Sequence, residues 1–345
     1  MTTILQLNKN HFENGEKSGE FLKKAIHNNI NKYEKLINQV GIWGKCELVL
    51  SKLTNLYPEY VDEIRGRASG AGVGFETYWA MMCPEIFETN FEHCTTIMCK
   101  DGNGHFLLSH NEDDEDNIEG NFCLSKIYND GEWVITGDSG HMPFGNGFSW
   151  NSHGIIKTIN YCHESDVREE NIPRYFLQRH ISGATSIDNL IERCSAFHPA
   201  SGFHVNAIDR NTDTAVSIEV YPDSVDVTNI EDCYIHSNHY IHNRYVNCPQ
   251  IDEGSNSIFR LYKAKDLFSQ LPIRNLDGLK RILKYRDELD RFEYSIFQTK
   301  KDPCITGMNF SYSVADNNKI YLDVYPFGER LELEYACNDE ILKSN

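Results

Sequence analysis

A β-hairpin that begins at a cysteine is the feature that most constrains the fold of this 345-residue chain. The alternating run Cys94-Thr95-Thr96-Ile97-Met98-Cys99 is followed by the turn residues Asp101-Gly102-Asn103-Gly104 and by a second run, His105-Phe106-Leu107-Leu108-Ser109. Two strand-like runs around Asp-Gly and Asn-Gly predict an antiparallel hairpin. Because a hairpin brings the start of its first strand to the end of its second, we expect Cys94 and Asp113 at the same end of a sheet. A thiol beside a carboxylate is a candidate nucleophile for covalent catalysis.

Hydrophobic periodicity divides the chain into a helical first part and a strand-rich second part. Helical spacing of apolar residues is found before Cys94, in four stretches: 16–40, 46–56, 60–67 and 75–82. After Cys94, short alternating runs dominate, and helical stretches interrupt them near 187–196, 258–268 and 276–285. The sequence shows no repeat and no low-complexity linker, so we expect one sheet-centred domain over residues 1–345.

Composition and charge exclude several classes of partner. Apolar residues make up 40% and charged residues 24%, which is typical of globular proteins, and the net charge of -18 argues against nucleic acid or an anionic membrane as a partner. The sequence has no run of 18 apolar residues and no secretory pattern over Met1 to Asn10. The eleven cysteines are scattered without regular spacing, so we expect reduced thiols and a cytoplasmic location.

Two polar or glycine-rich segments have an alternative functional interpretation. The run Gly66-Arg67-Ala68-Ser69-Gly70-Ala71-Gly72 could be a phosphate-binding turn, but it lacks the Lys-Ser/Thr pair and follows no convincing strand. A tight connection between helices, where only small residues fit, is the favoured interpretation. The acidic run from Glu112 to Asp116 lacks the spacing of a calcium loop and is typical of a solvated loop, from which Asp113 could still point inward.

A histidine-rich segment could bind a metal. His236, His239 and His242 follow one another at three-residue spacing, which on a helix could place zinc ligands on one side. The preceding residues, 232–235, are typical of a strand, where three-residue steps alternate between faces. Polar residues that line a pocket at the end of a strand are therefore the favoured interpretation.

Cys94 differs from the other cysteines, whose expected role is to fill the apolar core. No papain-like or caspase-like signature surrounds it. If the peptide bond before Cys94 is cut, the new α-amine lies on the nucleophile itself, and its pKa of ~7.7–8.0 allows it to act as the base for its own thiol. An N-terminal threonine is activated in the same way. Asp113 would orient this amine, and an asparagine amide would complete an oxyanion hole.

Motifs along almost the whole chain resemble those of the acyl-coenzyme A:6-aminopenicillanic acid acyltransferase family (C45 cysteine peptidases), within the N-terminal nucleophile hydrolases. They occur in the family's order, at Asn14–Gly19, Glu63–Gly72, Cys94–Thr96, His110–Asp113, Gly147–Gly154 and His236–Tyr240. The resemblance implies an α+β fold of the four-layer αββα type. It also implies a precursor that cuts itself between His93 and Cys94, into a helical segment 1–93 and a segment 94–345 that stay associated.

The resemblance also implies roles for individual residues. Cys94 is the nucleophile and carries the base, Asp113 holds the α-amine, and Asn238 stabilises the oxyanion. The wall of the substrate site is expected to include Asn151, Trp150 and His110. Of these, His110 stands where related bile-salt and penicillin V hydrolases carry an arginine.

One further position departs from the family pattern, since His93 stands where family members often have glycine. A side chain there restricts the bend of the backbone that self-cleavage requires.

The expected function is hydrolysis or transfer of the acyl group of a small linear amide through a Cys94 acyl-enzyme. Hydrolysis is favoured because transfer requires that water be excluded. Conjugates of β-alanine with biogenic amines are one substrate class to consider, and neither a cofactor nor a metal is expected. One alternative is a metal-dependent hydrolase that uses His236, His239 and the acidic run, and another is a non-catalytic binding protein that keeps the fold.

Overall fold

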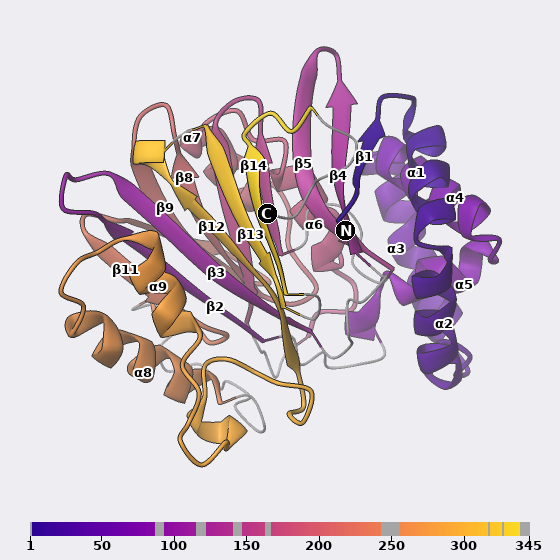
Figure 1. The fold of residues 1–345 in the computed structure, drawn as a ribbon. Coiled ribbons are helices and arrows are strands. Elements are labelled where there is room, and N and C mark those ends of the chain that lie inside the picture. Colours follow the sequence, from indigo (N-terminus) through magenta and orange to yellow (C-terminus); the bar gives the residue numbers. More distant parts are fainter. Residues whose placement is uncertain are drawn as a thin grey trace.

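Two stacked β-sheets with helices on the outer face of each form the protein (Figure 1). The computed structural model describes residues 2–86, 93–114, 122–140, 147–162, 167–242, 256–316, 318–325 and 328–338, except the side chain of Asp114. One apolar cluster lies between the sheets, and two others lie between a sheet and its helices. These clusters define four layers, which confirms the expected αββα arrangement.

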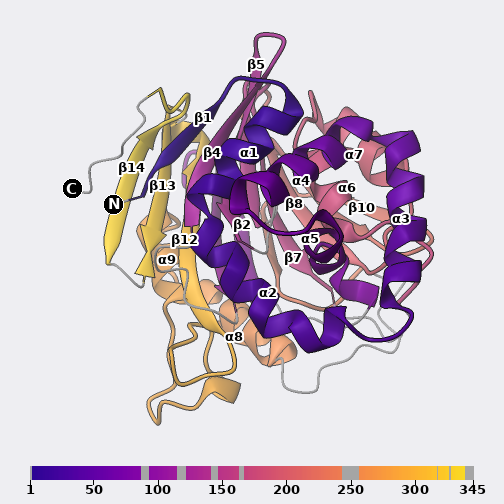
Figure 2. The ribbon, with the colours of Figure 1, turned by 90° about the vertical axis from the view of Figure 1, so that its right-hand side faces the viewer.

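The larger sheet has eight strands, and the helices α1 to α7 cover its outer face (Figure 2). In spatial order its strands are β1 (Ile4–Leu7), β4 (Phe122–Asn129), β5 (Glu132–Ser139), β6 (Phe148–Asn151), β7 (Ile155–Tyr161), β8 (Phe203–Asp209), β9 (Thr214–Val220) and β10 (Val225–Asn229). Strand β1 runs parallel to β4, and the other neighbours are antiparallel. The covering helices are α1 (His11–Phe21), α2 (Lys23–Ile37), α3 (Ile42–Leu56), α4 (Pro58–Ala71), α5 (Phe75–Met81), α6 (Arg174–Ile181) and α7 (Ile187–Ser195).

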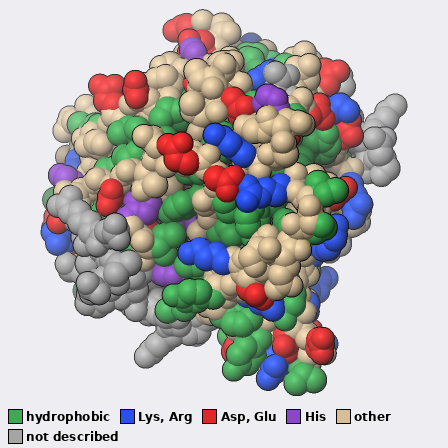
Figure 3. Space-filling model, turned by 90° about the vertical axis from the view of Figure 1, so that its left-hand side faces the viewer, with side chains coloured by type: hydrophobic (Ala, Val, Ile, Leu, Met, Phe, Trp, Pro, Cys, Tyr) green, Lys and Arg blue, Asp and Glu red, His purple; other side chains and the backbone are tan. Residues whose placement is uncertain are grey.

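The smaller sheet has six strands and carries two helices on its outer face. In spatial order its strands are β11 (Cys233–His236), β2 (His93–Lys100), β3 (Phe106–Asp114), β12 (Ile305–Ser313), β13 (Lys319–Val324) and β14 (Glu329–Glu334). The helices are α8 (Ser257–Ser269) and α9 (Leu276–Leu283), and short 3-10 turns occur at Pro84–Ile86, Phe292–Tyr294 and Val314–Asp316. On the side of the molecule where β11, α8 and α9 lie, acidic and basic side chains are interspersed (Figure 3).

The predicted hairpin is formed by β2 and β3, which pair antiparallel from His93 opposite Asp113 to Lys100 opposite Phe106. Residues of a strand alternate between the two faces of its sheet. Met98 accordingly lies in the core between the sheets, and Ile97 packs toward α8 and α9. By the same alternation Cys94 shares the face of Met98 and is directed toward the larger sheet.

The acidic run does not form a solvated loop where the structure describes it. Strand β3 extends through Asp114, and both Glu112 and Asp113 are buried. The expectation of a loop was wrong for this part because β3 continues beyond the apolar residues of the hairpin, while residues 115 and 116 lie outside the described ranges.

The glycine-rich motifs near residues 15 and 66 form a close contact between two helices. A Cβ atom on Gly66 of α4 would lie 2.0 Å from the carbonyl oxygen of Phe12 in α1, and one on Gly15 would lie 2.0 Å from that of Glu63. Helix α4 also continues to Ala71 and ends at Gly72, whose φ of 71° is left-handed. The expected turn therefore begins later than predicted, and the glycines permit close packing of the helix backbones.

A buried ion pair connects this helical layer to the larger sheet. Arg67 of α4 donates from Nη1 to Oδ1 of Asp138 in β5 at 2.7 Å and to Ser18 of α1 at 2.8 Å. It also bonds to Tyr78 and to the carbonyl oxygen of Ser139. Removing one partner of such a pair leaves an uncompensated buried charge, so this contact strongly couples the first 93 residues to the rest.

Within the described ranges, none of the helices has both the length and the apolar character needed to cross a membrane.

We predict that Gly66→Ala lowers the free energy of unfolding by about 3 kcal/mol, because the new methyl group overpacks the contact between α1 and α4. Gly44→Ala is the matched control, since Gly44 lies in α3 and an added Cβ meets no atom within 4 Å. This control should be neutral or stabilise by about 0.5 kcal/mol. Chemical denaturation of both variants measures the difference, and equal stabilities would contradict the predicted packing.

Candidate active site

Cys94 lies at the start of β2, buried where polar side chains fill the space between the sheets. On the same face of β2, Thr96 donates from Oγ1 to Oδ1 of Asn160 in β7 of the other sheet, at 2.9 Å. Asn206 of β8 donates to the same oxygen at 2.8 Å. The sheets are thus joined by polar contacts at this end and by the apolar core beyond it.

A carboxylate and an imidazole adjoin the sulfur of Cys94. Glu112 is directly opposite Cys94 in the hairpin, and its Oε1 lies 3.6 Å from Sγ. The other oxygen, Oε2, is 2.9 Å from Nε2 of His110, whose Nδ1 is 2.7 Å from Oγ1 of Thr96. A continuous polar path therefore leads from the thiol through Glu112 and His110 to Thr96.

Gly147 borders this path and belongs to the glycine motif that ends at Gly154. A Cβ atom at Gly147 would lie 2.8 Å from Oε2 of Glu112, and its φ of 71° is left-handed. Glycine is thus required here both by the backbone conformation and by the approach of the Glu112 carboxylate.

Burial lowers the pKa of His110 to about 3. The imidazole is therefore neutral at physiological pH, and it cannot supply the positive charge that an arginine at this position would carry. The structure places His110 in contact with Glu112 and Thr96, and its expected role in the wall of the substrate site stays a prediction.

Asp113 lies on the other face of the hairpin from Cys94. It pairs with His93, and its Oδ1 accepts a hydrogen bond of 2.6 Å from Oγ1 of Thr306 in β12. The structure thus brings Glu112 to the sulfur and Asp113 to the helix-covered face, so the role of Asp113 as holder of the amine stays a prediction. Strand alternation alone would have revealed Glu112, because it shares the face of His110 two residues earlier.

Asn238 contacts the main chain of Cys94. Its Oδ1 accepts hydrogen bonds from the backbone N–H of Cys94 at 2.8 Å and from Nη2 of Arg260 at 2.7 Å. Its Nδ2 donates to the carbonyl oxygen of Tyr161 at 2.8 Å, so the orientation of the amide is fixed by partners on both sides.

Sequence reasoning missed Arg260, which extends from α8 to the main chain of β2. Its Nη1 donates to the carbonyl oxygen of Cys94 at 2.5 Å and to Oγ1 of Thr95 at 2.8 Å. No motif marks this arginine, because its partners at the site, Asn238, Cys94 and Thr95, lie more than twenty positions away in the sequence.

Asn151 and Trp150 are engaged elsewhere. The Asn151 amide donates to the carbonyl oxygens of Ser182 and Ala184, and the Trp150 indole donates to that of Tyr335. Asn151 also borders a cavity of about 330 Å³, lined among others by Tyr57, Trp133 and Arg179 but not by Cys94. The structure does not bring these two predicted residues to the sulfur of Cys94.

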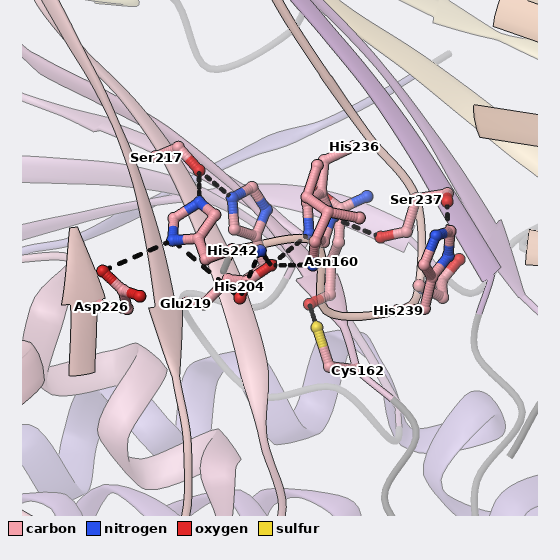
Figure 4. Close-up of polar contacts among 12 residues, drawn as sticks. Asn160, Cys162, His204, Ser217, Glu219, Asp226, His236, Ser237, His239 and His242 are labelled. Atoms are coloured by element: carbon pink, nitrogen blue, oxygen red, sulfur yellow. Dashed lines mark hydrogen bonds and ion pairs between the residues drawn. The ribbon is translucent and has the colours of Figure 1, made fainter. Parts of the chain in front are cut away.

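The three histidines of the histidine-rich segment, His236, His239 and His242, do not form one site (Figure 4). His236 and His242 approach the buried carboxylate of Glu219, at 3.3 Å and 3.9 Å. His239 instead lies 2.7 Å from Oγ1 of Ser257 at the start of α8. The alternative of a metal centre built from His236 and His239 therefore has no support in their geometry.

A further histidine, His204 of β8, lies beside His236 and His242, and together with Glu219 these residues form a second polar cluster (Figure 4). Its ring stacks on that of His236 with centroids 3.5 Å apart, and Ser217 bridges it to His242. Burial, together with the neighbouring imidazoles, lowers the pKa of His204 well below its ordinary value.

We predict that His110 makes the stability of the protein depend on pH. Because its folded-state pKa is lowered to about 3, the unfolded state binds the proton first as the pH falls below about 6.5. As the pH falls from about 6.5 to about 3, protonation of His110 in the unfolded state lowers the free energy of unfolding by about 1.4 kcal/mol per pH unit. Urea denaturation across this pH range should show that the free energy of unfolding depends less steeply on pH in His110→Gln than in wild-type protein. An identical pH dependence would contradict the lowered pKa of His110.

Comparison with known proteins supports the family resemblance. The family model described as acyl-coenzyme A:6-aminopenicillanic acid acyl-transferase matches residues 99–318, which is more than half of the chain. This match begins after Cys94 and so does not include it. A β-alanyl-dopamine/carcinine hydrolase from Drosophila melanogaster is 27% identical over 162 residues, and the alignment covers 41% of this chain and 41% of that protein.

Two similar solved structures are described as an acid amidase and a bile acid hydrolase. One is a Caenorhabditis elegans N-acylethanolamine-hydrolyzing acid amidase ortholog, with 9% identity, a TM-score of 0.46, and coverage of 72% of this chain and 95% of that one. The other is a variant of conjugated bile acid hydrolase from Clostridium perfringens, with 13% identity, a TM-score of 0.47, and coverage of 73% and 97%. On the family match, the chain belongs to the acyl-coenzyme A:6-aminopenicillanic acid acyl-transferase family of N-terminal nucleophile hydrolases.

Proposed function

We propose that the protein is a self-processing cysteine amidohydrolase or acyltransferase whose nucleophile is Cys94. The observation that carries this proposal is that the sulfur and the backbone nitrogen of Cys94 both have polar partners. The sulfur lies 3.6 Å from a carboxylate oxygen of Glu112, and the backbone nitrogen lies 2.8 Å from Oδ1 of Asn238. After a cut before Cys94 this nitrogen becomes an α-amine that is already held by a hydrogen-bond acceptor.

In the self-processing step the thiol proton passes to Glu112 and the thiolate attacks the carbonyl carbon of His93. The S–C bond forms, the C–N bond breaks, and the nitrogen of Cys94 takes up the proton. Water then hydrolyses the thioester, which leaves a carboxylate on His93 and a free amine and thiol on Cys94. Segments 1–93 and 94–345 stay associated because Arg67 and Asp138, one from each, form a buried ion pair.

During turnover the α-amine, with a pKa of ~7.7–8.0, accepts the thiol proton as the sulfur attacks the substrate carbonyl. The proton then passes to the leaving amine, and water hydrolyses the acyl-enzyme. Asn238 remains the proposed oxyanion donor, since its amide group carries a second hydrogen besides the one donated to Tyr161. Arg260 positions both Asn238 and the Cys94 carbonyl.

The proposed substrates are small linear amides, and hydrolysis is favoured over transfer. The Drosophila relative is described as a β-alanyl-dopamine/carcinine hydrolase. Because this chain aligns with only 41% of that relative, we propose β-alanyl amines as the first compounds to screen rather than as the assigned substrate.

We predict that purified wild-type protein consists of two fragments that meet at His93 and Cys94. Cys94→Ala should give one full-length chain, because no sulfur is present to attack the His93 carbonyl. Cys99→Ala is the matched control, since Cys99 is buried in the same strand on the face toward α8 and α9, and it should be cut normally. Intact mass spectrometry distinguishes these outcomes, and a single full-length wild-type mass would rule out self-processing of that preparation.

A second prediction separates the two neighbouring carboxylates. Glu112→Gln should slow the cut by about 10²-fold or more, which is the usual size of a general-base contribution. Asp113→Asn removes the same charge on the opposite face of the strand and should slow the cut by less than about tenfold. Time courses of cleavage after refolding measure both rates. A larger effect at Asp113 would contradict the proposed role of Glu112 in the cut.

A further inference from the structure

Cys94, His110 and Glu112 together present the donor atoms of a metal site. One ligand atom from each, a sulfur, an imidazole nitrogen and a carboxylate oxygen, can be chosen so that all lie within 4.8 Å of one another, and all three side chains are buried. In tetrahedral coordination at bond lengths of about 2.0–2.3 Å, neighbouring ligand atoms are roughly 3.3–3.8 Å apart. The sulfur lies 3.6 Å from Oε1 of Glu112, and Nε2 of His110 lies 2.9 Å from the other carboxylate oxygen, Oε2, so the side chains must shift to share one cation.

The residues behind His110 hold its ring in the orientation that a metal ligand needs. Its Nε2 is directed at Glu112, and its Nδ1 lies 2.7 Å from Oγ1 of Thr96. Thr96 donates onward to Asn160 of the opposite sheet, so the remaining hydrogen of the imidazole can be placed on Nδ1. Metal-ligating histidines are almost always oriented in this way by a bond from the second ring nitrogen.

We propose that a borderline-soft divalent cation, with Zn²⁺ as the representative, binds to Cys94 Sγ, His110 Nε2 and the Glu112 carboxylate and leaves a fourth position open. A thiolate, an imidazole and a carboxylate suit Zn²⁺, whereas Mg²⁺ and Ca²⁺ prefer six or more oxygen ligands. On binding, the S–H bond gives its proton to the solvent and a Zn–S bond forms. No electron is transferred, so the site needs no oxidant or reductant.

The functional consequence, which rests on the proposed function, is a reversible block of the nucleophile. The sulfur electron pair that would attack the substrate carbonyl is held by the cation instead. Zn²⁺ should therefore inhibit the enzyme, and a chelator should restore activity. A metal-dependent hydrolase would respond in the opposite direction and lose activity with the chelator.

Binding is tested on the full chain with Co²⁺ as a spectroscopic probe and with Zn²⁺ in competition. Wild-type protein should show a sulfur-to-cobalt charge-transfer band that one equivalent of Zn²⁺ abolishes. Cys94→Ala should lose the band, and His110→Gln and Glu112→Gln should weaken Zn²⁺ binding by about 100-fold or more. Thr96→Val, which removes no ligand but removes the hydroxyl group that orients His110, should weaken binding by about 10–100-fold.

Two matched controls keep this test specific to the site. Cys99→Ala removes a buried thiol of the same strand, and His204→Gln removes a buried imidazole of the other cluster, so both should retain the band and the affinity. Thermal unfolding of each variant shows that it is folded. An equal band in Cys94→Ala, or no band in folded wild-type protein, would overturn the proposed site.

The spectroscopic test does not depend on the proposed enzymatic activity. An uncut, inactive chain that still shows the Cys94-dependent band would support the metal site and contradict the proposed function. A cut, active enzyme without the band would support the proposed function and contradict the metal site.

Discussion

The register of β2 against β3 is the constraint on which the candidate site depends. Cys94 is opposite Glu112, so thiol and carboxylate share the face between the sheets, with Thr96 and His110 beside them. A shift by one residue would turn Cys94 toward α8 and α9. The register is held by alternating apolar residues, since Met98 and Leu108 fill the core between the sheets and cannot exchange faces without exposing it.

Polar groups between two sheets are costly to bury, and the structure compensates by giving them partners from both sheets. Thr96 reaches Asn160 of the larger sheet, and Asn160 is also held by Asn206. Asn238 and Arg260 bind the main chain of Cys94 from a third direction. These contacts fix Cys94 in one orientation, and the proposed role of Cys94 as the nucleophile requires such preorganisation.

Periodicity and turn residues were sufficient for the hairpin because they are local signals, whereas the four layers were expected only from the resemblance to the family. They were insufficient for the division of roles between Glu112 and Asp113, because a dense acidic run resembles a loop until the length of β3 is known. Arg260 was missed for a different reason, since its contacts with β2 arise only from the packing of α8. The glycines of α1 and α4 were noted in the sequence, but only the three-dimensional contact shows that they allow the two helix backbones to pack closely.

The identity of residue 110 determines what this site can bind. An arginine at this position would offer only donors and a fixed positive charge, so it would repel a divalent cation beside the sulfur. The buried, neutral imidazole of His110 offers a lone pair instead. A neutral imidazole supplies no cation to stabilise a thiolate, so the proposed mechanism assigns proton removal to Glu112 before the proposed cut and to the α-amine after it. Under the two proposals, metal binding and nucleophilic attack compete for one electron pair on Cys94.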